Sequence, residues 1–144
     1  GIFVLVRTSN PSAGEIQDLM VQGVPLHLKM AEKVREWNRN HLGECGYGPV
    51  GSVVGATRPD LLKILRDELP TSILLVPGYG AQGATARDVA PAFHQGGRGA
   101  LISASRSITF PWAATGSCTT DWRGAIEEAV IAMKREIAGA LGLD

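Results

Sequence analysis

The stretch Ile73-Leu74-Leu75-Val76-Pro77-Gly78-Tyr79-Gly80-Ala81-Gln82-Gly83 decides the fold. An apolar run stops at a Pro-Gly break and continues as a loop with three glycines. Proline ends strand pairing, and glycine permits positive φ angles and lets backbone amides approach an anion closely. The pattern indicates a β-strand whose carboxyl end leads into a ligand loop. A tight turn without a ligand is the alternative.

The same event recurs about one strand and one helix later. The apolar run Ala100–Ser103 leads into Ala104-Ser105-Arg106-Ser107. A guanidinium can bind phosphate bidentately, and serine adds hydroxyl and amide donors. In a (β/α) barrel the loops after the last two strands often build a phosphate site. We therefore expect Pro77–Gly83 and Arg106 to form one. A carboxylate partner for Arg106 at the barrel rim is the alternative.

The rest of the chain alternates strands and helices. The apolar runs are nearly continuous, which predicts parallel strands covered on both faces. They are Ile2–Arg7, Gly51–Gly55, Ile73–Val76 and Ala100–Ser103. Helices are expected from about Leu26 to His41, from Pro59 to Pro70, from a Thr85 cap to Gly96, and from Thr120 or Asp121 onward. We expect one α/β domain over residues 1–144, with right-handed crossovers.

Four strand–helix units are half of an eight-stranded barrel. The chain also begins inside its first expected strand, with no preceding turn. We therefore expect a fragment that lacks the upstream half of its barrel. Its first and last strands would be unpaired edges, which predicts a partner: a second copy of the chain or the missing half.

Composition excludes several classes of protein. Lys plus Arg and Asp plus Glu are 14 each, so nothing favours nucleic-acid binding. No apolar run reaches the roughly 18 residues of a membrane span, and no signal peptide is recognisable, so we expect a cytoplasmic protein. Cys45 and Cys118 are far apart and read as free thiols, and the three histidines lack metal-site spacing, so no metal is expected.

The first strand ends in the polar sequence Thr8-Ser9-Asn10. Short polar side chains at this end of a strand face the ligand in α/β folds, so Ser9 is a candidate to bond a base. A helix-capping role for Ser9 is the alternative. Thr57 and Arg58 follow the second strand in the equivalent position, and Arg58 reads as a charge on the rim.

Taken together, the chain resembles the C-terminal half of orotidine 5′-phosphate decarboxylase, in particular its longer bacterial subgroup. The matching pieces occur in family order and are spread over most of the chain: Phe3–Pro11, Val53–Thr57, Leu75–Gly83 and Ser103–Ile108. The resemblance implies a (β/α)₈ TIM barrel in which these are the fifth to eighth strands. It implies that Ser9 bonds the pyrimidine and that Gln82 lies near the phosphate and base. It further implies that Arg106 and the Ser105 amide bind the phosphate, and that Pro77 and Gly78 begin the phosphate-side loop.

The family decarboxylates orotidylate to UMP and CO₂ without a metal or organic cofactor, and it is typically dimeric. Its catalytic Lys and Asp array includes an Asp-x-Lys-x-x-Asp run, and no Asp-x-Lys occurs in this sequence. We therefore expect no catalytic residue on this chain, only substrate-binding ones, and negligible turnover. Two alternatives remain: another phosphate-binding barrel enzyme, or a non-catalytic half-barrel that serves binding or assembly.

Overall fold

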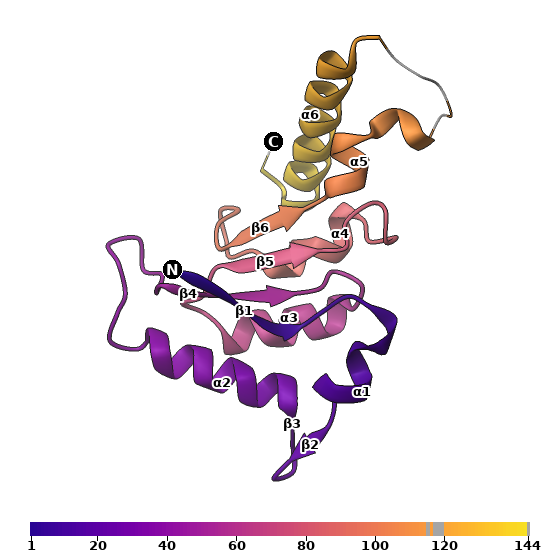
Figure 1. Cartoon of the computed structure of the whole chain (residues 1–144). Helices are drawn as coiled ribbons and strands as arrows, with labels where there is room; N and C mark the ends of the chain where they lie inside the picture. The colour runs from indigo at the N-terminus through magenta and orange to yellow at the C-terminus, as the bar shows by residue number, and fades with distance from the viewer. Residues whose placement is uncertain (115, 117–119, 144) are drawn as a thin grey trace.

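Four parallel strands form the centre of the molecule (Figure 1). The structure, a computed structural model, describes residues 1–114, 116 and 120–143. The strands are β1 (Ile2–Arg7), β4 (Val50–Val54), β5 (Leu74–Pro77) and β6 (Ala100–Ser103), paired in that order. The predicted bounds of β1 and β6 are confirmed, and those of β4 and β5 differ by one residue. Because all pairs are parallel, the carboxyl ends of all four strands lie at one edge.

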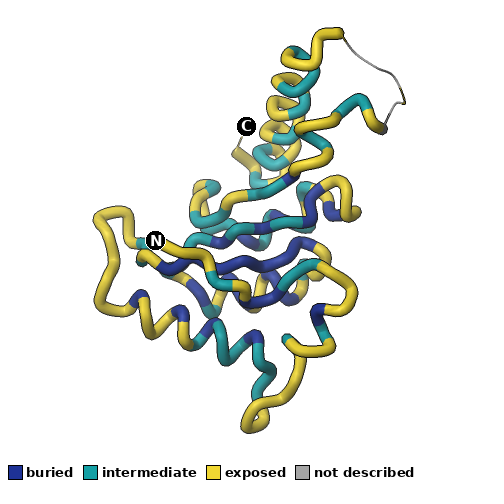
Figure 2. The backbone as a smooth tube through the Cα atoms, viewed as in Figure 1, coloured by how far each residue is buried: buried dark blue, intermediate teal, exposed yellow. Residues whose placement is uncertain are grey.

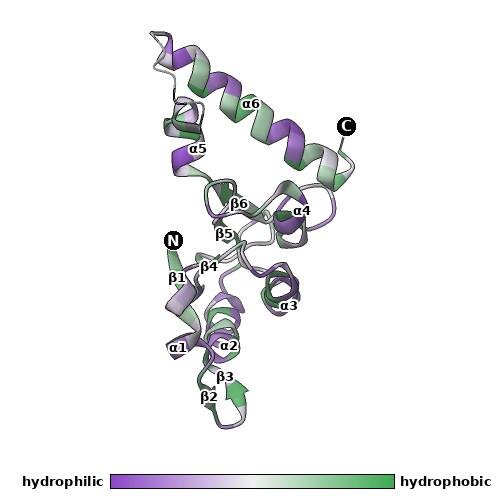
Figure 3. Cartoon of the chain, turned by 90° about the vertical axis from the view of Figure 1, so that its right-hand side faces the viewer, coloured by the Kyte–Doolittle hydropathy of each residue, from purple (hydrophilic) through white to green (hydrophobic). Residues whose placement is uncertain are grey.

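Helices α2 (Leu26–Asn38), α3 (Pro59–Glu68), α4 (Ala86–Val89) and α6 (Trp122–Leu141) lie to one side of the sheet (Figure 3). The helix expected from Leu26 ends at Asn38, before His41. The helix expected to run from Thr85 to Gly96 is one α turn followed by the 3-10 turn η2 (Ala90–Ala92), since Pro91 has no N–H to continue the ladder. The Thr85 cap itself is confirmed, because the Thr85 amide donates a hydrogen bond to Asp88 Oδ2 (2.7 Å).

Several short elements were not expected from the sequence. The turn η1 (Pro11–Ala13) and helix α1 (Gly14–Gln17) follow β1 and lead into the hairpin β2 (Met20–Val21) and β3 (Val24–Pro25). Gln22 and Gly23 both have positive φ angles, as the two central residues of a two-residue hairpin turn commonly do. After β6, helix α5 (Ser105–Thr109) and turn η3 (Pro111–Ala114) precede α6.

The hydrophobic core lies between the sheet and the helices (Figure 2). Alternate residues of the strands point into it, and α3 supplies the largest buried side chains. Val6, Val54, Leu74, Val76, Leu62, Leu65 and Leu69 are each at most 1% exposed. This face therefore has the packing expected of a barrel's outer, helix-covered surface.

The other face of the sheet is largely open at its two outer strands. Phe3 is 45% exposed, Leu5 62% and Leu101 53%. The prediction that every strand is covered on both faces is therefore wrong for β1 and β6, because these side chains stay about half exposed to solvent. It is correct for β4, whose five residues are all buried. There the Phe3 ring lies against Gly51, where a β-carbon would overlap it.

Buried polar side chains of the helices hydrogen-bond the backbone at the amino ends of the strands. Arg66 of α3 is 4% exposed and donates to the carbonyls of Gly99 (3.0 Å), Ser72 (2.9 Å) and Leu69. Burial lowers the pKa of this guanidinium. Asn38 of α2 exchanges two hydrogen bonds with the backbone of Val50. These contacts fix where β4, β5 and β6 begin.

We predict that Gly55→Ala destabilises the fold. The Ser9 backbone crosses Gly55 so closely that a β-carbon there would lie 2.7 Å from Ser9 Cα. Relieving this overlap shifts backbone, so we expect a loss of about 1–3 kcal/mol in the free energy of unfolding. Gly43→Ala is the matched control, since its nearest contact is 3.6 Å, and we expect a change within about 0.5 kcal/mol. Urea denaturation measures both, and equal stabilities would contradict the close approach.

Candidate functional site

Three of the loops that follow the strands meet at the carboxyl edge of the sheet. A β-carbon on Gly78 would lie 3.5 Å from Cβ of Ser9, and one on Gly80 would lie 3.1 Å from Oγ of Ser107. The glycine loop after β5 therefore touches the loop after β1 on one side and helix α5 on the other. The structure thus brings together Ser9, the Pro77–Gly83 loop and the Ser105–Ser107 turn.

The Pro77–Gly83 segment is a folded turn. Gly78, Gly80 and Gly83 have φ angles of 111°, 68° and 93°, which L side chains rarely adopt. The Gly80 amide donates a hydrogen bond to the Ala84 carbonyl (2.9 Å), and the Gly83 amide donates one to the Gly80 carbonyl (2.8 Å). Gln82 at the tip is exposed and lines a hollow of about 200 Å³ together with Thr57.

Arg106 lies in the first turn of α5 and is exposed. Within the part of the chain that the structure describes, its guanidinium has no carboxylate or hydrogen-bond partner. The alternative of a rim ion pair is therefore not realised there. The N-cap of helix α5 is Ala104, whose side chain cannot accept a hydrogen bond, so the first-turn amides beside Arg106 remain available as donors to another group.

Ser9 does not cap the turn that follows β1. Asn10, not Ser9, is the N-cap of η1, and neither side chain caps that turn. The Ser9 carbonyl accepts a hydrogen bond from the Thr57 hydroxyl (3.4 Å), which joins the loops after β1 and β4. Arg58 pairs with Asp60 through two bonds of 3.1 and 2.9 Å, and this pairing lowers the pKa of Asp60 to about 2. Arg58, the N-cap residue of α3, is thus paired with a carboxylate in the first turn of that helix.

A polar cluster holds the start of the loop that follows β1. It consists of Arg7, Asp18, His27 and Gln17, and it was not predicted from the sequence. Arg7 binds both carboxylate oxygens of Asp18 (3.0 and 3.1 Å) and the Thr8 carbonyl (2.8 Å). His27 Nδ1 lies 3.1 Å from Asp18, and the Thr8 amide donates to Gln17. The Arg7 hydrogen bonds hold the pKa of Asp18 below its usual range.

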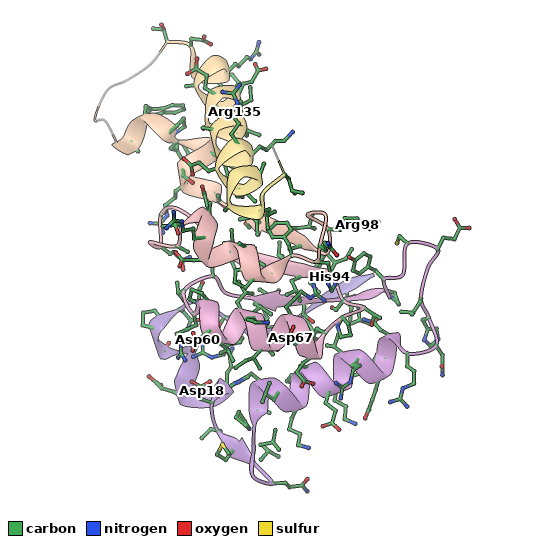
Figure 4. The ribbon with its side chains drawn as sticks, turned by 180° about the vertical axis from the view of Figure 1, so that it is seen from behind. Asp18, Asp60, Asp67, His94, Arg98 and Arg135 are labelled. Carbon is green, nitrogen blue, oxygen red and sulfur yellow. The ribbon has the colours of Figure 1, made fainter. Side chains whose placement is uncertain are left out.

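Neither the cluster nor its location is visible in sequence spacing, because the partners come from a strand, a short helix and the start of α2. His27 lies in the first turn of α2 and is buried. Figure 4 places Asp18 and Asp60 toward one end of the sheet, and His94 and Arg98 toward the other. His94 Nε2 lies 3.0 Å from the Pro70 carbonyl, and burial lowers the pKa of His94.

The described residues hold no group of three or more His, Cys, Asp or Glu side chains placed to bind a metal. Cys45 is an exposed free thiol, and Cys118 lies outside the described residues. None of the helices in the described part of the chain has the length and apolar character needed to cross a bilayer.

The parallel sheet, its one-sided helix layer and the loops at its carboxyl edge define a (β/α) half-barrel. No family model matches the chain. It is 46% identical over 143 residues to an orotidine 5′-phosphate decarboxylase of Rhodopirellula baltica, covering 96% of this chain and 47% of that protein. It is 48% identical over 142 residues to the enzyme of that name from Deinococcus radiodurans, covering 99% and 48%.

The structure of Leishmania donovani OMP decarboxylase superposes with a TM-score of 0.68 at 33% identity, covering 94% of this chain and 47% of that one. The chain therefore belongs to the orotidine 5′-phosphate decarboxylase family. It spans about half the length of the curated relatives it matches.

We predict that Asp18→Asn destabilises the chain by about 1–3 kcal/mol, because it leaves the buried Arg7 guanidinium without its carboxylate. Asp67→Asn is the matched control, since Asp67 pairs with Lys63 where both side chains are about two-thirds exposed, and it should cost less than about 0.5 kcal/mol. Because the pKa of Asp18 is lowered on folding, its stabilisation is present above about pH 4 and is lost as the pH falls through the folded value. Urea denaturation at pH 7 and pH 3 measures this, and a pH-independent difference would contradict the ion pair.

Proposed function

We propose that this chain is the phosphate- and pyrimidine-binding C-terminal half of an orotidine 5′-phosphate decarboxylase. The enzyme converts orotidine 5′-phosphate to UMP and CO₂. The observation that carries the proposal is the meeting of Ser9, the glycine loop and the Arg106 turn at one edge, with Arg106 unpaired among the described residues. The similarity to proteins named orotidine 5′-phosphate decarboxylase supports it.

In this proposal each loop has one task. The Arg106 guanidinium and the Ser105 amide bind the phosphate, because a planar cation and an uncapped helix turn both favour phosphate oxygens. The loop that begins at Pro77 and Gly78 closes the phosphate side with backbone amides. Gln82 reaches from the loop tip toward phosphate and base, and Ser9 hydrogen-bonds the pyrimidine.

The chemical step belongs to residues outside this sequence, which has no Asp-x-Lys. The family resemblance assigns the protonating lysine and its carboxylate partners to the other half of the barrel. Phosphate binding still contributes to catalysis, since binding energy from a remote part of the substrate can stabilise the transition state. The 144-residue chain should therefore bind nucleotide weakly and not decarboxylate it.

The open face and the two edge strands support association with another barrel half. β1 and β6 each have one unpaired side in the described sheet, and Leu5 and Leu101 next to those sides are exposed. We propose that the remaining barrel half covers them in a cytoplasmic, dimeric enzyme. Pairing of two copies, as in a non-catalytic half-barrel module, is the alternative that the same exposed edges favour.

Titration of the ¹⁵N-labelled chain with UMP, ribose 5-phosphate and uridine tests the proposal. We expect UMP to shift the amide signals of Gly78, Gly80, Gly83 and residues 105–107. UMP should bind more tightly than ribose 5-phosphate, because only UMP offers a base to Ser9 and Gln82. Circular dichroism confirms that the sample is folded. Equal weak affinity for both phosphates would favour a sugar-phosphate enzyme, and no shift at these loops would refute the site.

We predict that Arg106→Ala weakens UMP binding at least tenfold, because a hydrogen bond to a charged group contributes about 1.5–3 kcal/mol. Arg98→Ala is the matched control. It removes the same charge just before β6, at the opposite edge of the sheet from Arg106. Its UMP affinity should equal that of the wild type. Unchanged affinity in Arg106→Ala would remove Arg106 from the phosphate site.

A further inference from the structure

Tyr79 is the only aromatic residue of the glycine loop, and it is bonded to the helix layer. It is 8% exposed, and its hydroxyl donates a hydrogen bond to the Glu136 carboxylate of α6. The residues on either side of it, Gly78 and Gly80, both have positive φ. Both residues that flank the buried ring thus have backbone conformations that L side chains rarely adopt.

The backbone of Tyr79 also holds the loop together. Tyr79 and Ala84 form an isolated bridge, and the neighbouring Gly80 amide donates to the Ala84 carbonyl. Ala84 is itself buried. Residues 81–83, including Gln82, project beyond this closed base and are exposed. Displacing Tyr79 would therefore move the whole exposed tip.

Helix α6 packs against the elements next to both the glycine loop and the Arg106 turn. It contacts α4, which follows the glycine loop, and α5, which carries Arg106 (Figure 3). A groove of about 450 Å³ separates the loop from α6, and Tyr79, Ser107, Met133 and Glu136 line it. Met133 and Ile137 of α6 pack against the core cluster to which Tyr79 belongs. Among the described residues, the Tyr79–Glu136 hydrogen bond adds a polar contact across the groove.

The protonation state of Tyr79 keeps this hydrogen bond in place near neutral pH. Burial and the Glu136 carboxylate raise the pKa of Tyr79 to about 12. The phenol therefore stays protonated and donates at any pH near neutrality. A hydrogen bond from a neutral hydroxyl to a carboxylate is among the stronger kinds that proteins form.

We infer that the Tyr79–Glu136 hydrogen bond is a latch that sets the position of the glycine loop relative to the Arg106 turn. Tyr79 is thus a positioning residue that holds the loop amides in place without touching the ligand. Its effect on nucleotide affinity rests on the proposed function, whereas its effect on the loop does not.

Hydrogen exchange of the labelled chain tests the latch without a ligand. Tyr79→Phe keeps the buried ring and removes only the hydroxyl. We expect exchange of the Gly80 and Gly83 amides to rise roughly five- to tenfold, with the amides of β4 unchanged. Glu136→Ala, at an exposed position, should produce the same local change. Unaltered exchange in both variants would overturn the latch, whatever the chain binds.

Nucleotide titration separates positioning from general destabilisation. Tyr79→Phe should weaken UMP binding several-fold and leave uridine binding unchanged, because only UMP uses the phosphate loop. Glu136→Gln keeps an acceptor oxygen and should restore most of the UMP affinity that Glu136→Ala loses. Glu128→Ala, an exposed glutamate of the same helix, is the control. Equal losses for UMP and uridine would overturn the positioning role. A wild type without phosphate-dependent binding would instead refute the proposed function.

Discussion

Parallel pairing of four consecutive strands is the constraint on which the rest of the molecule depends. It places all four carboxyl ends at one edge, so loops far apart in sequence, such as those at Ser9 and Gly78, become neighbours. The pairing is anchored at the other edge, where Arg66 and Asn38 bind the carbonyls and amides at which the strands begin.

Glycine does two different jobs at the ligand edge. At Gly55 the missing β-carbon lets the Ser9 backbone cross closely, which joins the first two loops. At Gly78 and Gly80 positive φ angles turn the chain around Tyr79. The first is a matter of space and the second of backbone conformation. Together they account for the close contact of the loops at this edge.

Local pattern predicted the elements that buried packing dictates. Continuous apolar runs located the strands to within one residue, and the Thr85–Asp88 capping pattern located the start of α4. It failed where partners are distant or elements are very short. The Arg7–Asp18–His27 cluster joins three elements, and Pro91 ended a helix that apolar spacing alone would continue. Propensity cannot weigh such contacts, because they exist only after folding.

The candidate site divides along the same line. Residue order and type were enough to indicate a half-barrel, a glycine loop, an arginine turn and a family, because strand periodicity and glycine chemistry are local properties. Only the tertiary structure decided that Arg106 lacks a carboxylate partner among the described residues, that Ser9 caps no helix, and that Tyr79 reaches Glu136 on α6. Each of these depends on which distant groups the sheet brings within hydrogen-bonding distance, and no local pattern encodes that distance.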